Sequence, residues 1–166
     1  ERQAQIHRAW ALQLEQRAAK EPLATAGMTE AEARRHERKA GTLTRELADL
    51  RFATRYYLDD LARAADDLRR GQGFEQAIIV YRKFLAEQPR QGEPEALVGL
   101  GESLLALSKT AEALEVLQQC HAQFPRHPAS YRARLLTSLA LGEEGKLSDA
   151  KQLLVDNLYN FSLAPE

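Results

Sequence analysis

Apolar residues recur every three or four positions along most of this 166-residue chain, which is the period of an α-helix. Ile6, Trp10 and Leu14 lie four residues apart and form one apolar stripe on a first helix over about residues 3–20. Glu21-Pro22 ends this helix, because the residue before a proline is disfavoured in the helical conformation. Runs that alternate apolar and polar residues, as half-buried strands do, are almost absent. The pattern therefore predicts an all-α chain.

A second helix is expected to begin at Thr29, after a loop over residues 22–28. Thr29 and Glu32 have the spacing of a capping box, in which each side chain accepts a hydrogen bond from the other residue's free backbone N–H. Gly41-Thr42 indicates a kink or a break, because glycine is a weak helix former. Residues 1–54 are thus predicted to form an N-terminal helical pair.

A seam of apolar and small residues follows, stepping alternately by four and three positions until Gly71-Gln72-Gly73. Its members are Leu43, Leu47, Leu50, Thr54, Tyr57, Leu61, Ala64 and Leu68. This spacing predicts one long helix that runs into the second half of the chain, and it is typical of a coiled coil with another subunit or with the first helix. Thr54 and Ala64 weaken the seam as a self-sufficient zipper and favour packing inside its own domain.

The second half repeats itself with a period of 36 or 37 residues, each repeat having room for two short helices. Such a period is the signature of a helical solenoid, in which small residues occupy the close crossings of helices. The repeated positions are the alanines Ala77, Ala113 and Ala150, the larger apolar residues Tyr81, Leu117 and Leu154 that follow each by four residues, and the helix-ending Pro89 and Pro125.

The segment from Leu97 to Pro125 resembles a tetratricopeptide repeat (TPR). Its first helix matches the W-x2-L-G-x2-Y pattern at Leu97, Leu100, Gly101 and Leu104, and its second matches A-x3-F-x2-A-x4-P at Ala113, Leu117, Cys120 and Pro125. The preceding unit fits at Leu61, Ala64, Ala65, Leu68, Ala77, Tyr81, Phe84 and Pro89. The following unit departs from the pattern, because its first helix has about three extra residues and no glycine or alanine at the expected place, and Asn157 replaces a small residue.

The resemblance covers about residues 58–161. It implies a solenoid of about three TPR-like helical hairpins over residues 55–166, with units at about 58–89, 94–125 and 128–161. The N-terminal helical pair over residues 1–54 would precede this array, capping it or forming a coiled coil.

The resemblance also implies a concave groove that binds a partner protein. By position in the family's first helices, its lining would be Asp59, Ala62, Asp66, Arg69, Glu95, Val98, Glu102, Leu105, Arg132 and Leu136. These residues are mainly acidic and apolar, so a basic or amphipathic peptide or helix is the favoured partner.

The overall charge excludes several classes of partner. The chain has 23 basic and 24 acidic side chains, a formal net charge of −1, which disfavours broad binding to nucleic acid or to anionic membranes. No stretch of 18 apolar residues would span a bilayer. The single cysteine, Cys120, excludes an intramolecular disulfide and is expected to be a buried structural thiol.

No residue pattern points to catalysis, to a metal or to another cofactor, so none is expected. The histidines lack metal-ligand spacing and are predicted to be surface or capping residues: His7, His36, His121 and His127. Neighbouring carboxylates point in different directions on a helix, so three pairs are expected to be solvated surface: Asp59-Asp60, Asp66-Asp67 and Glu143-Glu144. The basic run over residues 34–39 is also interpreted as a solvated face.

The sequence therefore predicts a non-enzymatic scaffold for protein–protein interaction. Three alternatives stay open: a homo-oligomeriser, a bacterial envelope-assembly component that uses the heptad-patterned helix, and a docking segment of a larger enzyme. Because the chain starts without methionine, we expect it to be part of a longer protein. Its location, in the bacterial periplasm or envelope or in the cytoplasm, stays open for the same reason.

Overall fold

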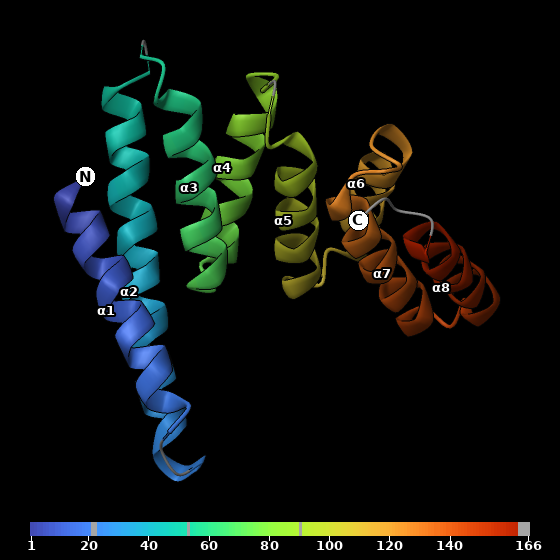
Figure 1. Ribbon diagram of the computed structural model, residues 1–166, viewed down its shortest axis with the longest axis horizontal. Helices are drawn as coiled ribbons and strands as arrows, with labels where there is room; N and C mark the ends of the chain where they lie inside the picture. Colours follow the sequence, from blue (N-terminus) through green and yellow to red (C-terminus); the bar gives the residue numbers. More distant parts are fainter. Residues whose placement is uncertain (21–22, 53, 90, 163–166) are drawn as a thin grey trace. The chain divides into compact units, whose positions relative to one another are not determined.

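The computed structural model describes residues 1–20, 23–52, 54–89 and 91–162, and this part of the chain is entirely helical, as predicted (Figure 1). The helices are α1 (Arg2–Ala18), α2 (Leu23–Leu50), α3 (Tyr57–Arg70), α4 (Phe74–Ala86), α5 (Glu93–Ala106), α6 (Thr110–Gln123), α7 (Pro128–Glu143) and α8 (Leu147–Ser162). They form two compact units, Glu1–Glu87 and Gln88–Glu166, and each is described by itself. The sequence-based boundary after residue 54 falls between α2 and α3, inside the first unit.

In the first unit, α1 and α2 form a long antiparallel pair. Glu1 at the start of α1 forms an ion pair with Arg51 just after the end of α2, at 3.0 Å. Between them, the Arg8 guanidinium donates a hydrogen bond to the Thr44 hydroxyl at 2.7 Å. The N-terminal helical pair is therefore present, with α1 close to its predicted bounds. The predicted helix stop at Glu21-Pro22 lies outside the described residues.

Helix α2 is longer and less interrupted than its sequence suggests. It begins at Leu23, so Thr29 lies inside the helix, and the capping box that we placed there is wrong. The helix also continues through Gly41-Thr42 without a break. Gly41 lies instead at a close contact between helices. A Cβ at this position would lie 2.6 Å from Leu68 Cγ and 2.9 Å from the Leu68 backbone nitrogen. The glycine lets α2 and α3 approach each other closely.

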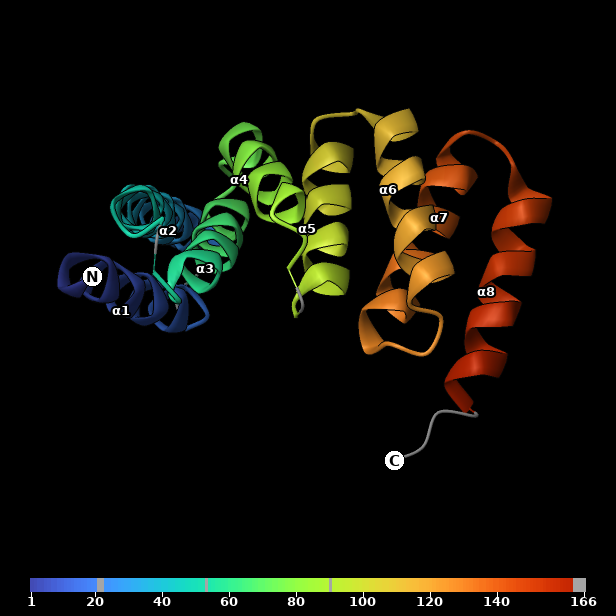
Figure 2. The same ribbon diagram turned by 90° about the horizontal axis from the view of Figure 1, so that it is seen from above.

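The predicted single long helix is also wrong, because α2 ends at Leu50 and α3 starts at Tyr57. The two halves of the heptad seam therefore lie on two helices that pack as a hairpin, and Figure 2 shows α2 and α3 side by side. On α3 the seam residues Leu61, Ala64 and Leu68 are buried, whereas Leu50 is 84% exposed. Folding back against α2 gives the α3 residues a buried environment that a continued helix would not.

The apolar stripe that we identified on α1 is not its buried face. Ile6 is 40% exposed and Trp10 is 49% exposed. Alanines that recur every seven or eight residues are buried instead, at Ala4, Ala11 and Ala18 on α1 and at Ala33, Ala40 and Ala48 on α2. Small side chains allow two helix axes to lie close together along their whole length, and this close approach decides which face of α1 turns inward.

Helices α3 to α8 form three hairpins, each with the same turn. The middle residue of each turn has a left-handed backbone, with φ of 59° at Gln72, 57° at Ser108 and 78° at Gly145. One residue later, the backbone N–H of Gly73, Lys109 and Lys146 donates to a carbonyl five residues back, at 2.8–2.9 Å. This is the Schellman arrangement that ends helices. The helix pairs predicted at about 58–89, 94–125 and 128–161 are therefore helical hairpins that share one type of turn.

Counting back from these turns corrects our reading of the third hairpin. The residue seven positions before the left-handed residue is Ala65 in the first hairpin, Gly101 in the second and Ser138 in the third, and all three are buried. The third hairpin thus has a small residue at the crossing, which we had missed. A Cβ on Gly101 would lie 2.6 Å from the Leu117 side chain, so these helices cross at close range.

Candidate functional site

The described part of the chain has no group of three or more His, Cys, Asp or Glu side chains that could hold a metal ion. Among the described helices, none combines the length and the apolar composition needed to cross a membrane. The candidate site is therefore the set of side chains on the first helices of the hairpins, which the sequence singled out as a binding surface.

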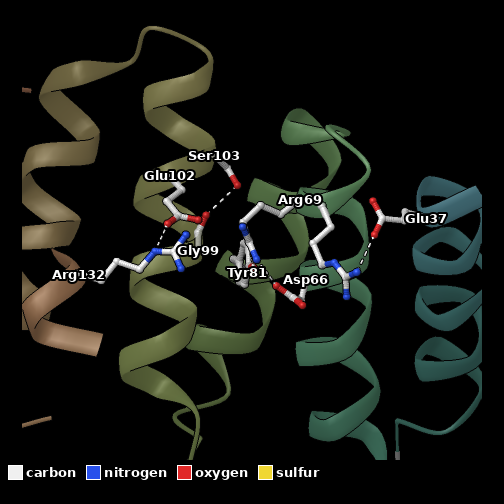
Figure 3. Close-up of polar contacts among 9 residues, drawn as sticks. Glu37, Asp66, Arg69, Tyr81, Gly99, Glu102, Ser103 and Arg132 are labelled. Atoms are coloured by element: carbon white, nitrogen blue, oxygen red, sulfur yellow. Dashed lines mark hydrogen bonds and ion pairs between the residues drawn. The ribbon is translucent and has the colours of Figure 1, made fainter. Parts of the chain in front are cut away.

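In the first unit, the candidate residues lie along α3. Asp59 is exposed, and Ala62, Asp66 and Arg69 are half-buried. The Arg69 guanidinium forms an ion pair with Asp66 at 2.5 Å and donates a hydrogen bond to the Tyr81 hydroxyl at 3.3 Å (Figure 3). Burial lowers the pKa of Arg69, but the contacts with Asp66 and Tyr81 outweigh it and the net shift is upward. The negative charge of Asp66 is thus already offset within its own helix.

In the second unit, the candidate residues come from α5 and α7. Arg132 of α7 forms an ion pair with Glu102 of α5, which Figure 3 shows joining the two helices. Nearer the start of α5, His127 Nε2 lies 3.6 Å from a carboxylate oxygen of Glu95. Leu105 and Leu136 are half-buried, while Val98 is buried and offers little surface. The structure therefore brings Glu102 and Arg132 together, which the sequence did not reveal.

These pairs change the charge that the candidate surface presents. The Glu102 side chain is only 14% exposed, whereas its partner Arg132 is 61% exposed and Glu95 is 62% exposed. The surface of the second unit thus presents both signs of charge beside two half-buried leucines, rather than the mainly acidic lining that we inferred from residue types.

In two of the neighbouring carboxylate pairs one member is buried rather than solvated, contrary to our expectation. Asp60 and Asp67 are buried, at 5% and 6% exposure. Asp67 accepts a hydrogen bond from Arg8 Nε at 2.7 Å, and Asp60 lies 3.3 Å from Arg51. Burial raises the pKa of Asp67, although the hydrogen bond from Arg8 partly offsets this. In contrast, Glu143 and Glu144 are exposed as predicted.

The basic run over residues 34–39 is likewise only partly solvated. Glu37 is buried and forms an ion pair with Arg70 at 3.1 Å, and Arg38 donates a hydrogen bond to the Gly71 carbonyl. Burial raises the pKa of Glu37 against the opposing effect of Arg70. For Asp60 and Asp67, the spacing shows only that both carboxylates share one face of α3 with Ala64, at steps of four and three residues. It does not show that arginines face them.

One surface pocket of about 300 Å³ lies in the first unit, beside Glu37 and Arg70. Two ion pairs line this pocket, Glu37 with Arg70 and Arg34 with Glu30, the latter at 3.2 Å, and Glu15 lies beside them. The pocket therefore presents both signs of charge.

The remaining candidate residues have structural roles in the described chain. Cys120 is fully buried, as expected, and burial raises the pKa of its thiol, which opposes formation of a reactive thiolate. The His127 side chain accepts a hydrogen bond from the Ala129 backbone N–H and caps the start of α7, as predicted for a capping histidine. His7 and His36, far apart in sequence, lie together between α1 and α2.

The fold and the candidate surface thus define an all-α protein of helical hairpins, with paired charges on the first helices. Neither a protein-family model nor a curated protein sequence matches this chain. Its function is therefore inferred from its own residues.

Proposed function

We propose that the chain is a non-enzymatic scaffold of the tetratricopeptide type, which binds a peptide or helix of another protein through the first helices of its hairpins. The observation that carries this proposal is that three helical hairpins share one structure. Each has a left-handed residue in its turn and a buried small residue seven positions earlier, and both features recur at intervals of 36 and 37 residues. Stacked hairpins of this kind bury one face of each helix and leave side chains of successive helices in rows, which suits them to binding extended partners.

The chemistry of the exposed side chains favours an amphipathic partner of mixed charge. Asp59 and Glu95 are exposed acids that complement basic groups, and Arg132 is an exposed base that complements an acidic one. Leu105 and Leu136 add half-buried apolar surface beside them. A purely basic peptide would leave Arg132 facing a like charge, which costs binding free energy.

The experiment is a pull-down from native extract in which the chain and four single variants serve as bait. Asp66→Lys tests the first unit and Glu102→Lys tests the second. Glu75→Lys on α4 and Glu115→Lys on α6 make the same charge change on exposed second-helix positions of the same two units, so they are the matched controls. Circular dichroism establishes that each bait is folded.

A partner that is retained by the chain and by both controls, but lost with Asp66→Lys or Glu102→Lys, supports the proposal and locates the contact. A partner retained equally by all five baits contradicts binding through the first helices. The heptad seam lends less support to the oligomeriser alternative, because the seam is divided between α2 and α3, which pack as a hairpin. Light scattering that shows a mass independent of concentration would remove it altogether.

A further inference from the structure

Two histidines meet across the N-terminal helical pair. His7 comes from α1 and His36 from α2, and their Nδ1 atoms are 2.7 Å apart. The ring centroids are 5.0 Å apart, with 32° between the ring planes. Both side chains are half-buried, so they are held in place yet reachable from solvent. The proposed scaffold function makes no use of this pair.

Trp10 packs on both histidines and limits how they can move. Its ring meets His7 edge-on at 5.5 Å and His36 edge-on at 5.1 Å, measured between centroids. Trp10 is the only tryptophan of the chain. Its fluorescence therefore reports directly on what happens between the two imidazoles.

The two Nδ1 atoms face each other and share one proton. A distance of 2.7 Å requires one ring to donate its Nδ1–H and the other to accept it with its Nδ1 lone pair, so an ion bound by both atoms would displace this proton and the donating ring would carry its proton on Nε2 instead. A neutral imidazole is the form that binds metal ions. Lys39 is exposed, so solvent screens its charge from the pair.

The spacing of the rings also fits a shared ion. Two imidazoles that each bind one ion at about 2.0–2.1 Å, with an angle of roughly 100° at the ion, have ring centres about 5 Å apart. The observed separation of 5.0 Å meets this condition. The rings need only rotate so that the two Nδ1 atoms open from 2.7 Å to about 3.2 Å and aim at a common point.

We propose that His7 and His36 form a two-histidine site for a divalent first-row transition-metal ion, which binds Cu(II) more tightly than Ni(II) or Zn(II). Imidazole is a preferred ligand of all three ions, and the order follows their general affinity for nitrogen ligands. Each ring would carry its proton on Nε2 and offer the Nδ1 lone pair, and water would complete the coordination. Because the ligands come from α1 and α2, the ion would fasten these two helices together.

The first measurement is a Cu(II) titration of the untagged chain at about pH 7.5, followed by Trp10 fluorescence. Saturable quenching with one equivalent of ion is expected, reversed by a chelator. His7→Gln and His36→Gln should each weaken binding by about tenfold or more, since loss of a mere supporting residue already costs that much at metal sites. His121→Gln, on α6 of the second unit, removes a histidine elsewhere and should bind like the parent chain.

A second measurement uses Zn(II), which has no redox chemistry, and follows thermal unfolding. Zn(II) should raise the unfolding temperature of the parent chain and of His121→Gln, but not that of His7→Gln or His36→Gln. If a substitution disturbs the packing of α1 on α2, NMR spectra of the unmodified chain give the same test. The ring signals of His7 and His36 should then shift at a lower Zn(II) concentration than those of His121.

Quenching that does not saturate, or that is equal in the parent chain and both pair variants, would overturn the site. Trp10 fluorescence that changes between about pH 5 and 8 but not with any of the three ions would also overturn it, and would show that the two rings only share a proton.

Discussion

Buried alanines line the contact between α1 and α2, whereas buried leucines fill the second unit. Ala4, Ala11 and Ala18 bury one methyl group each, while Leu97, Leu100, Leu104 and Leu117 bury whole aliphatic side chains. A buried leucine removes far more apolar area from water than an alanine does, and stabilises the fold accordingly. The contact between α1 and α2 must therefore gain more from close backbone approach, and the second unit more from apolar burial. The α3–α4 hairpin of the first unit resembles the second unit in this respect, because Leu61, Leu68 and Phe84 are buried there.

The two units also differ in how their carboxylates are buried. In the first unit, Glu37, Asp60 and Asp67 are buried, and each lies beside an arginine. In the second unit, the Glu102 carboxylate pairs with an arginine that is mostly exposed. Buried ion pairs orient helices but add little net stability, because desolvation opposes the attraction between the charges. We infer that the first unit is the more sensitive of the two to small changes at its helix contacts.

The largest effect is expected at the closest helix contact of the first unit. Gly41→Ala places a Cβ 2.9 Å from the Leu68 backbone nitrogen and 3.0 Å from the Ala64 backbone oxygen, which cannot move aside without shifting α3. We expect a loss of about 3 kcal/mol in the free energy of unfolding, measured with urea. Gly27→Ala is the control in the same helix, since no atom lies within 4 Å of its Cβ. It should be neutral or stabilising by up to about 1 kcal/mol.

The next effect comes from leaving a buried carboxylate without its partner. Arg8→Ala removes the guanidinium that lies 2.7 Å from Asp67, which is only 6% exposed. We expect a loss of about 2 kcal/mol at neutral pH, less than for a fully buried pair because Arg8 is partly exposed. Arg8→Ala combined with Asp67→Asn should recover part of this loss, and failure to recover any would contradict the importance of the pair.

The burial of Asp67 can be tested by the pH dependence of the free energy of unfolding. The folded chain holds the Asp67 proton more tightly than the unfolded chain does, because burial raises the pKa above its usual 3.8. The resulting stability is present at low pH and is lost as the pH rises through the folded-state pKa. Relative to Asp67→Asn, the parent chain should therefore become more stable as the pH is lowered from neutral towards that usual value. Asp67 also raises the pKa of Glu37, so both proteins should carry Glu37→Gln to remove that second titration.

A smaller effect is expected at Gly101, where two helices of the second unit come into close contact. Gly101→Ala brings its Cβ within 2.6 Å of the Leu117 side chain, with no backbone atom among its nearest neighbours. The leucine can adjust more readily than a backbone can, and alanine favours the helix, so a loss of about 1 kcal/mol is expected by urea unfolding. Gly142→Ala, with open space around it in α7, is the control. A loss at Gly101 equal to that at Gly41 would remove the distinction between the two units.

The sequence predicted features that depend on local residue types, but not contacts between residues that are distant in sequence. Gly71-Gln72-Gly73, the repeated alanines and the two prolines predicted the hairpins, because turns and close crossings demand particular residue types locally. The same reasoning failed at Gly41, where a residue needed for a close contact looks like one that breaks a helix. It also failed at Asp60 and Asp67, because residue spacing does not tell which polar face will meet a charged partner from a helix that is distant in sequence. The contact between His7 and His36 was not predicted for the same reason.

The smallest effect should come from the exposed pair of the candidate binding surface. Arg132→Ala removes an ion pair with Glu102 in which the arginine is 61% exposed, so we expect a loss below about 0.5 kcal/mol. Because solvent already screens this pair, any loss should vanish in about 1 M salt. The loss in Arg8→Ala should persist there, since Asp67 stays buried. An Arg132→Ala loss as large as that of Arg8→Ala would mean that Glu102 and Arg132 hold α5 and α7 together, and that Arg132 is not available to a partner.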